Sequence, residues 1–219
     1  MTDDTNLAES QRVPRRRKHA RAKELREAAL ALFVEKGFEA TRTEEIAARA
    51  GLSKGALYLY YPSKENLLHA VIDSPVLAAF ISACSSARCG GTHAHTLRHL
   101  LSVIWTQLQD EDVCNVLKLA VVEAPRFPVG MDIWLRKVVG PLCSLIADVV
   151  SKGVWDGEFR KVDPHGAAHS LLLPMFMVCL QRGLFDKRTP AEQCPDERFI
   201  PQHVGLVLRG LGIDPQMER

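Results

Sequence analysis

The sequence predicts an all-α protein with a small N-terminal three-helix domain and a larger C-terminal helical domain. Three observations support this fold class. Apolar residues recur at three- and four-residue spacing in successive segments, which is the period of an amphipathic helix. The segments after residue 93 show no alternation of apolar and polar residues, so no strand is expected there. Residues 41–67 read as two short helices joined by a tight turn and followed by the start of a third.

The first 17 residues are polar and lack an apolar period, so we expect a disordered basic arm over residues 1–17. Arg12, Arg15, Arg16 and Arg17 supply its charge. Two roles stay open for this arm. It is either a solubilising tail or a flexible segment that contacts phosphates or the minor groove of a nucleic acid.

An amphipathic helix is predicted over residues 18–36. Its apolar face consists of Leu25, Ala28, Ala29, Leu32 and Phe33. Gly37 follows as a C-cap, because glycine readily adopts the left-handed conformation that ends many helices. Thr41 or Thr43 is then expected to cap the next helix.

A helix-turn-helix pattern is centred on Gly51. Ile46, Ala47 and Ala50 form a small apolar face on the first short helix, and Gly51 stands where that helix must stop and the chain must bend. Ser53 is a favourable N-cap for the second short helix. Two helices joined at a steep angle by a short glycine turn are typical of this motif, although an ordinary helical hairpin uses similar residues.

The sequence of this segment resembles the N-terminal domain of TetR-family transcriptional regulators. The resemblance lies in the string Ile46-Ala47-x-x-Ala50-Gly51-Leu52-Ser53-x-Gly55-x-Leu57-Tyr58-x-Tyr60-Tyr61-x-Ser63-Lys64-Glu65-x-Leu67. It covers about the first third of the chain and implies that the second short helix enters the major groove of DNA. The positions that match DNA contacts in the family are Thr43, Ser53, Lys54, Gly55, Ala56, Tyr58, Tyr60 and Lys64.

Chemistry divides these positions into two groups. Gly55 and Ala56 carry no hydrogen-bonding side chain, so base readout is expected to depend on Lys54 and on apolar contact with thymine methyl groups. Thr43 and Lys64, at helix starts, are expected to contact phosphates. The charge distribution agrees, because residues 1–64 hold 13 Lys and Arg against 9 Asp and Glu, whereas the remainder holds 15 against 17.

The rest of the chain reads as a helical body. A helix begins after Ser63, and Pro75 is expected to break it near Asp73 and Ser74. Further helices are predicted over residues 94–109, 112–124, 130–152 and 164–184, and a last one from Phe199 to Leu211. Two strings resemble the C-terminal domains of an AcrR-like branch of the same family, namely Glu123-Ala124-Pro125-Arg126-Phe127-Pro128 and Gly153-x-x-x-Gly157-x-Phe159-Arg160-x-x-Asp163-Pro164.

The body is expected to hold a pocket for a small apolar or aromatic effector. Its helices carry large, adaptable side chains, and prolines at positions 141 and 174 bend two of them, which hinders complete packing. The family resemblance implies the same pocket. The candidate lining residues are Trp105, Leu117, Phe127, Met131, Trp134, His169 and Phe176, with polar contacts from His169, Gln107 or Arg126.

The two C-terminal helices carry more apolar surface than a helix on the outside of a protein needs. From Ala167 to Leu180 the chain is almost wholly apolar. Either these helices close the core of one chain, or they pair with their copies in a homodimer, as the resemblance implies. We favour the dimer, with an interface at Leu172, Phe176, Leu180, Val204, Val207 and Leu208.

Other classes of function find little support in the sequence. No phosphate-binding glycine loop, nucleophile elbow or apolar pair of carboxylates is evident, so we expect neither an enzyme nor a cofactor. His95 and His99 are four residues apart and lie near Cys89 and His93, but they follow a glycine pair, which favours solvated histidines over a metal site. The six cysteines form no C-x-x-C pair and are expected to be reduced thiols.

No run of 18 apolar residues and no signal-peptide pattern is present, so we expect a cytoplasmic protein with no membrane partner. The predicted domains are a basic arm over 1–17, a helix-turn-helix DNA-binding domain over 18–64 and a helical ligand-binding and dimerisation domain over 65–219. The predicted function is a dimeric, ligand-responsive repressor of a palindromic DNA operator. The alternatives are a redox- or metal-sensing regulator of the same fold and, in another class, a small helical enzyme or adaptor.

Overall fold

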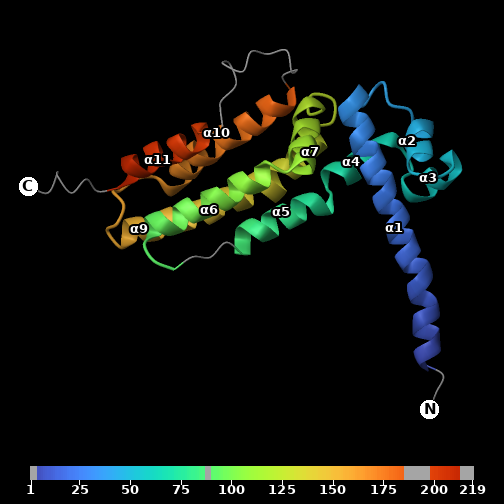
Figure 1. Ribbon diagram of the computed structural model, residues 1–219, viewed down its shortest axis with the longest axis horizontal. Coiled ribbons are helices and arrows are strands. Elements are labelled where there is room, and N and C mark those ends of the chain that lie inside the picture. Colours follow the sequence, from blue (N-terminus) through green and yellow to red (C-terminus); the bar gives the residue numbers. More distant parts are fainter. Residues whose placement is uncertain (1–3, 87–89, 185–197, 213–219) are drawn as a thin grey trace, which may run out of the picture. The chain divides into compact units, whose positions relative to one another are not determined.

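The computed structural model describes residues 4–86, 90–184 and 198–212, and within these ranges the chain forms helices and no strand (Figure 1). One isolated β-bridge joins Phe159 and Gly212. The chain divides into two compact units, Met1–Asp73 and Ser74–Arg219. The all-α fold class predicted from the apolar periodicity is therefore confirmed.

The N-terminal unit packs short helices against one long helix. α1 contacts α2 and α4, and α2 contacts α3. The helices are α1 (Asp4–Lys36), α2 (Thr43–Arg49), α3 (Lys54–Tyr60) and α4 (Lys64–Ile72). The largest side chains that this unit buries completely are Leu25, Ile46, Leu57, Leu67, Leu68 and Ile72. Gly37 directly follows the last residue of α1 and has a φ of +80°, as expected for a glycine that caps the C-terminus of a helix.

Two features of this unit differ from the sequence expectations. α1 is helical from Asp4, where a disordered arm was expected over residues 1–17. Ala, Glu, Gln and Arg in that segment are good helix formers and allow the helix to continue towards its N-terminus. The compact unit also extends past the boundary expected after Lys64, because α4 buries Leu67 and Leu68 in the N-terminal unit.

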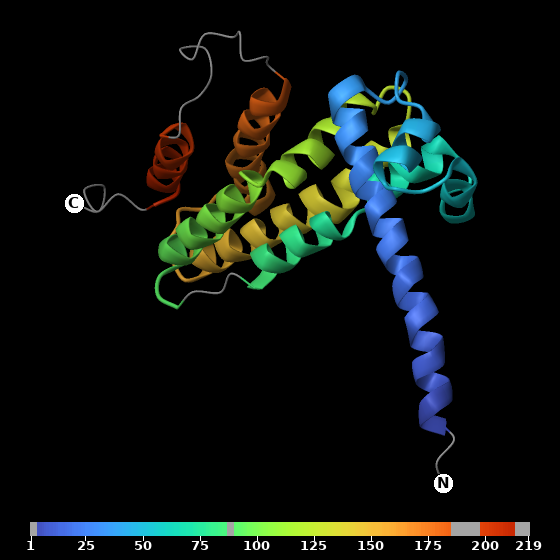
Figure 2. The same cartoon turned by 45° about the vertical axis from the view of Figure 1, so that its right-hand side comes forward.

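The C-terminal unit is built around α9, which packs against α6 and α10 (Figure 2). α10 also contacts α7 and α11. The helices are α5 (Pro75–Ser86), α6 (His93–Leu108), α7 (Glu111–Val122), α8 (Pro128–Trp134), the π-helical segment η1 (Leu135–Val139), α9 (Gly140–Trp155), α10 (Pro164–Leu184) and α11 (Phe199–Leu211). The break predicted at Asp73 and Ser74 is confirmed, since α4 ends at Ile72 and α5 begins at Pro75.

The bend predicted at Gly140-Pro141 takes the form of a π turn. The backbone N–H of Gly140 donates to the carbonyl of Leu135, five residues earlier. Pro141 has no N–H, and its ring would clash with the carbonyl of Lys137 in a regular α-helix. A widened turn just before the proline lets one helical path continue from α8 into α9.

The corner between α9 and α10 is tied to the start of α6. Glu158 accepts hydrogen bonds from the backbone N–H groups of His93 and Ala94, each at 2.7 Å. His93 Nε2 lies 2.6 Å from Asp156 Oδ2. His93 is thus engaged with the corner, whereas His95 and His99 are exposed. Among the described residues, no group of His, Cys, Asp and Glu could hold a metal ion.

The cysteines depart from the expectation that all are reduced thiols. The structure joins Cys114 of α7 and Cys179 of α10 in a disulfide, although the two residues are 65 positions apart. The pairing follows from the side-by-side packing of α7 and α10, which spacing along the sequence does not reveal. Cys84 and Cys143 are free and buried, and Cys89 and Cys194 lie outside the described residues.

One stretch, Lys64–Ser86, is long and apolar enough to cross a membrane by length and composition alone. It consists of α4 and α5, which are separate helices on either side of Asp73 and Ser74. Four of the apolar side chains of α4 are packed inside the N-terminal unit, at 0–1% exposure. Core packing accounts for the apolar character of α4, and the absence of a membrane partner stays a prediction.

Candidate nucleic-acid interface

The turn between α2 and α3 is held by backbone geometry that the sequence predicted. Gly51 has φ +66°, a left-handed conformation that side-chain-bearing residues rarely adopt. The N–H of Leu52 donates to the carbonyl of Ala47 at 2.8 Å and closes the end of α2. Ser53 Oγ accepts from the N–H of Ala56 at 3.2 Å and caps the start of α3. The turn therefore fixes the direction in which α3 leaves α2.

The inner face of α3 is anchored by two residues. Leu57 is completely buried. Tyr61, at the C-cap of α3, donates from its hydroxyl to the carbonyl of Ala22 at 3.1 Å and accepts from Arg26 at the same distance. In the sequence, Tyr61 stands out only as part of the string that resembles the family. Its role as a clamp between α3 and α1 depends on partners almost 40 positions away, which no local pattern identifies.

The outer face of α3 is open to solvent. Leu59 is 83% exposed and Tyr58 is 41% exposed. A Cβ added at Gly55 would meet no atom within 4 Å, so the helix surface there is unobstructed. Lys54 is also exposed, and Ala56 and Tyr60 are partly exposed. The expected DNA-contacting positions of α3 thus share one accessible surface with Leu59, which the sequence analysis did not single out.

An ion pair between α2 and α3 crosses this surface. Lys54 Nζ lies 2.5 Å from Glu44 Oε1, and the hydrogen bond lowers the pKa of the Glu44 carboxyl while raising the pKa of Lys54. The Thr43 and Tyr58 hydroxyls lie 3.3 Å apart. Glu44 was not predicted as a site residue, because its partner Lys54 lies ten positions away and the two meet only through the turn between α2 and α3. A nucleic acid that binds Lys54 must compete with Glu44.

Lys64 has a different position from the one expected of a phosphate contact. Its ammonium group donates to the carbonyls of Phe38 at 2.8 Å, Thr41 at 3.0 Å and Glu39 at 3.4 Å. It also lies 4.3 Å from the centre of the Phe38 ring. A lysine has three donor hydrogens, and three carbonyls accept them here. Lys64 therefore braces the loop between α1 and α2, which corrects the expectation that it is available to phosphates.

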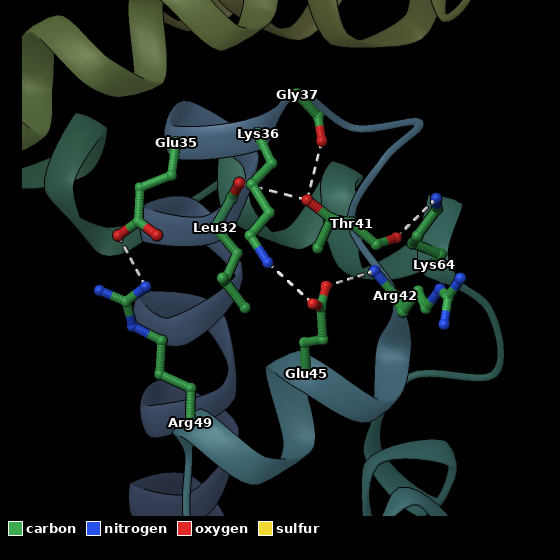
Figure 3. A network of polar contacts seen from close by, with 9 residues as sticks. All are labelled: Leu32, Glu35, Lys36, Gly37, Thr41, Arg42, Glu45, Arg49 and Lys64. Carbon is green, nitrogen blue, oxygen red and sulfur yellow. Dashed lines mark hydrogen bonds and ion pairs between the residues drawn. The ribbon is translucent and has the colours of Figure 1, made fainter.

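A polar network fixes this same loop (Figure 3). The Thr41 hydroxyl lies 2.7 Å from the carbonyl of Gly37 and 3.2 Å from that of Leu32, and Thr41 is only 1% exposed. Thr41 thus bonds backward to α1 instead of capping α2, and Arg42 occupies the N-cap position. Thr43, the other expected cap, is the first residue of α2.

Further contacts in Figure 3 connect both ends of α2 to α1. Glu45 accepts from the backbone N–H of Arg42 at 3.1 Å and pairs with Lys36 at 2.8 Å. Arg49, in the last turn of α2, pairs with Glu35 at 2.6 Å. Lys36 and Glu35 both belong to the last turn of α1. Each pair is exposed and individually weak, but together they connect both ends of α2 to the last turn of α1.

The expected effector residues occupy different environments in the C-terminal unit. Leu117, Trp134 and Phe176 are buried, and the Trp134 and Phe176 rings meet edge to face at 5.3 Å. Trp105, Phe127 and Met131 are partly exposed. His169 is exposed, and its Nδ1 lies 2.8 Å from the carbonyl of His165 on its own helix. The structure therefore contradicts the expectation that His169 faces an interior pocket.

Two hollows of the C-terminal unit lie away from these residues. One is beside Trp155 and Pro164, and another lies between α10 and α11 near Val162 and Val207. Neither is lined by the seven residues expected to contact an effector. The buried aromatic pair is packed against itself in this structure, so an effector would have to separate or displace it.

The residues expected at the dimer interface are mostly interior. Leu172, Phe176, Val204 and Leu208 are at most 8% exposed within the single chain, whereas Leu180 and Val207 are partly exposed. The first four fill the contact of α10 and α11 with the C-terminal unit and are not available to a second chain. Among the side chains described on these two helices, Leu173 is 51% exposed, Met177 is 56% exposed and Leu206 is 64% exposed.

Comparison with known proteins identifies the arrangement. Residues 25–71 match the family described as bacterial regulatory proteins, tetR family. The chain is 47% identical over 149 residues to the HTH-type transcriptional regulator RutR of Escherichia coli O157:H7. The aligned region covers 66% of this chain and 67% of RutR.

Two solved structures share the fold. A candidate TetR-family regulator from Mesorhizobium loti superimposes with a TM-score of 0.68 and 26% identity, covering 90% of this chain and 99% of that one. SmeT, the repressor of the SmeDEF multidrug efflux pump of Stenotrophomonas maltophilia, gives a TM-score of 0.67 at 19% identity, covering 89% and 91%. The glycine turn, the anchored and exposed faces of α3 and these similarities lead to one assignment. The chain belongs to the TetR family and is a helix-turn-helix transcriptional regulator, not an enzyme.

Proposed function

We propose that the protein is a dimeric repressor that releases a palindromic operator when a small apolar or aromatic effector binds its C-terminal unit. The observation that carries the DNA-binding part is the outer face of α3, which exposes Lys54, Tyr58 and Leu59 while Leu57 anchors the helix from behind. A short, rigidly supported helix with an exposed mixed face suits insertion into the major groove.

The chemistry of this face indicates how it would read bases. Lys54 donates to the O6 and N7 acceptors of guanine, and Leu59 and Ala56 contact thymine methyl groups. Glu44 accepts from a cytosine N4 amino group once Lys54 has moved to its base. On non-specific DNA the Glu44 carboxylate instead repels the phosphates. The Glu44–Lys54 pair would thus favour specific over non-specific binding.

Dimerisation would use the exposed apolar side chains of α10 and α11. Leu173 and Met177 are four residues apart on α10 and so share a helix face, and Leu206 adds a third exposed side chain on α11. A two-fold symmetric pair of chains can present two α3 helices to half-sites about 34–36 Å apart, or a multiple of that spacing. The N-terminal part of α1, residues 4–17, carries four arginines that would add phosphate contacts without sequence preference.

Effector binding is supported by the composition of the C-terminal core. The Trp134 and Phe176 rings meet directly before a π turn, Leu117 is also buried in this unit, and π turns are frequent at functional sites. Since His169 is exposed, Gln107 is the better polar candidate. An effector that releases DNA must favour the non-binding state by a coupling of about 1–3 kcal/mol, and DNA must weaken the effector equally.

We also propose that the protein belongs to the AcrR-like branch of the TetR family. The two AcrR-like strings correspond to the turn between α7 and α8 and to the corner between α9 and α10. SmeT, which shares the fold, is a repressor by description, and this supports repression as the mode of action. A regulator that binds operators works in the compartment that contains the genome, so we assign it to the cytoplasm.

The decisive experiment is selection of operator sequences from random duplex DNA by the purified full chain. We expect a palindrome with two half-sites, bound by two chains in sedimentation. Lys54→Ala should lose about tenfold or more of the preference at one base pair per half-site. The matched control is Lys152→Ala, because Lys152 is also exposed and pairs with Asp148 at 2.6 Å but lies in the C-terminal unit. Equal losses in both variants would contradict the assignment.

A further inference from the structure

A covalent bond joins two helices of the C-terminal unit. Cys114 lies in the second turn of α7 and Cys179 lies in the C-terminal half of α10. Their Cα atoms are 6.0 Å apart, which is within the usual range for a disulfide. No function discussed above uses this bond. We propose that Cys114 and Cys179 form a reversible thiol–disulfide site that reacts with low-molecular-weight disulfides of the glutathione class and controls the packing of α7 on α10.

Access to this site is one-sided. Cys114 is partly exposed, whereas Cys179 is 1% exposed. An external disulfide or thiol can therefore reach the sulfur of Cys114 first, and Cys179 acts as the resolving partner from inside. This division between an accessible and a protected cysteine is the arrangement that exchange chemistry requires.

The reduced state is also accommodated. Cys114 Sγ lies 2.9 Å from the carbonyl oxygen of Leu108. Leu108 is the last residue of α6, where helix geometry leaves carbonyl groups without an intrahelical donor. After reduction the thiol of Cys114 can donate its hydrogen to this oxygen. The reduced thiol thus has a hydrogen-bond acceptor in place, so opening the disulfide does not leave the sulfur of Cys114 without a polar partner.

The other two described cysteines, Cys84 and Cys143, are poorly placed to react with a small-molecule disulfide. Cys84 and Cys143 are buried, and burial raises the pKa of Cys84 to about 12 and raises that of Cys143 as well. Thiols of this kind are rarely ionised and react slowly with disulfides. A DNA-binding protein works where free thiols are kept reduced, and disulfides in such compartments are mostly transient or sensing. The Cys114–Cys179 pair is consistent with that use.

The reaction conserves atoms and electrons in two exchange steps. The Cys114 thiolate attacks one sulfur of oxidised glutathione, forms a mixed disulfide and releases one glutathione thiolate. The Cys179 thiolate then attacks Cys114 Sγ, forms the intramolecular bond and releases the second glutathione. The protein loses two protons and two electrons, and oxidised glutathione becomes two molecules of the reduced form. Excess reduced glutathione or a dithiol reverses both steps.

The bond links elements that surround the proposed effector region. Leu117 follows Cys114 by three positions on α7, and Phe176 precedes Cys179 by three positions on α10, so each cysteine shares a helix face with a candidate effector residue. Phe176 in turn contacts Trp134. The oxidised form therefore restricts the movement of α7 away from α10. Its effect on DNA affinity rests on the proposed function, whereas formation of the bond does not.

The test uses the full chain with Cys89→Ser and Cys194→Ser, which removes the cysteines outside the described residues. The protein is equilibrated with oxidised glutathione or with a large excess of reduced glutathione, then unfolded and alkylated, and its thiols are counted by mass. We expect two fewer alkylated thiols after oxidation, at Cys114 and Cys179, and full recovery after reduction. An unchanged thiol count, or a bond that excess reduced glutathione leaves intact in the folded chain, would overturn the proposal.

The physical consequence is measured on the same samples. Oxidation should raise Tm by roughly 5–10 °C and should change tryptophan fluorescence through Trp134. Cys114→Ser and, separately, Cys179→Ala should abolish both responses, and Cys143→Ala is the matched control that should keep them. A Tm response that persists in Cys114→Ser would assign it to another cysteine and refute the site.

Operator affinity then tests regulation separately. Using the duplex selected by the reduced protein, we expect at least about a fivefold difference in Kd between the two states. Equal Kd values in both states would refute the control of DNA binding while leaving the thiol count to establish the site. Absence of selected DNA in either state would contradict the proposed function, and the thiol count and Tm would still decide on the disulfide.

Discussion

The two units of this protein are stabilised in different ways. The N-terminal unit combines a small apolar core with polar links between helices, such as Tyr61 to Ala22 and Lys64 to the α1–α2 loop. The C-terminal unit relies on long apolar helices packed around α9. The difference follows from use. A unit that must expose most of α3 has little apolar surface left to bury, so hydrogen bonds from behind the helix hold its direction.

The aromatic residues allow this comparison to be tested in one sample. The three tyrosines, Tyr58, Tyr60 and Tyr61, all lie in the N-terminal unit, and the three tryptophans all lie in the C-terminal unit. Tyrosine absorbance therefore follows unfolding of one unit and tryptophan fluorescence follows the other.

The largest effect is expected from Leu57→Ala. Leu57 is completely buried and is the apolar anchor of α3, so its truncation should lower the free energy of unfolding of the N-terminal unit by about 2–5 kcal/mol. The tyrosine transition in denaturant should shift, and the tryptophan transition should stay where it is. If both transitions shift equally, the two units do not unfold independently and the comparison fails.

Next in size is the loss of the dimer in Leu173→Glu. A charge on the proposed face should weaken association by about 2–4 kcal/mol and reduce operator binding, as sedimentation and mobility-shift titrations would measure. Val129→Glu provides the matched control, since Val129 is equally exposed at 51% but lies on α8. Dimers of unchanged affinity in Leu173→Glu would place the interface on another surface.

A smaller effect is expected from Lys64→Met, which keeps most of the side-chain length but removes the ammonium group. The carbonyls of Phe38 and Thr41 lose a donor, so the N-terminal unit should be destabilised by about 1–3 kcal/mol. The slope of log K against log salt for DNA should be unchanged. A slope that becomes shallower by about 0.9 would instead restore Lys64 as a phosphate contact.

The smallest effect is expected from Glu44→Gln. Removing the carboxylate frees Lys54 and lifts repulsion from phosphates, so affinity for random DNA should rise a few-fold while the preference for the operator falls. Stability should barely change, because the pair is exposed. Competition titrations with random duplex measure the ratio of operator affinity to random-DNA affinity. Weaker binding to random DNA in this variant would show that Glu44 does not oppose phosphate binding.

Features that depend on neighbours along the chain were predictable. The glycine C-cap at Gly37, the turn at Gly51 and the serine cap at Ser53 each follow from the conformational preference of one residue. The break before Pro75 has the same local origin. These signals suffice for the order of the helices and for the helix-turn-helix.

Features that depend on distant partners were not predictable. Lys64 looked available to DNA until the loop at Phe38 folded over its ammonium group. Leu172 and Phe176 looked suited to an interface because periodicity reports that a face is apolar but not what covers it. No local pattern in the sequence predicts the pairing of Cys114 with Cys179, which are 65 positions apart. The resemblance to a family supplied candidate positions, and only the three-dimensional contacts assigned their roles.

The π turn at η1 makes the length of this segment more important than its composition. A π turn contains one more residue than the α-helical turn it replaces, so removing a single residue between Leu135 and Val139 would restore a regular α-helix. Because the widened turn takes up its extra residue within about one revolution of the helix, the deletion would leave α8 in nearly the same rotational register relative to α9. Trp134 would stay on the side of the helix that meets Phe176. The cost of the deletion would fall on Pro141, whose ring would meet the carbonyl group four residues earlier in the restored α-helix.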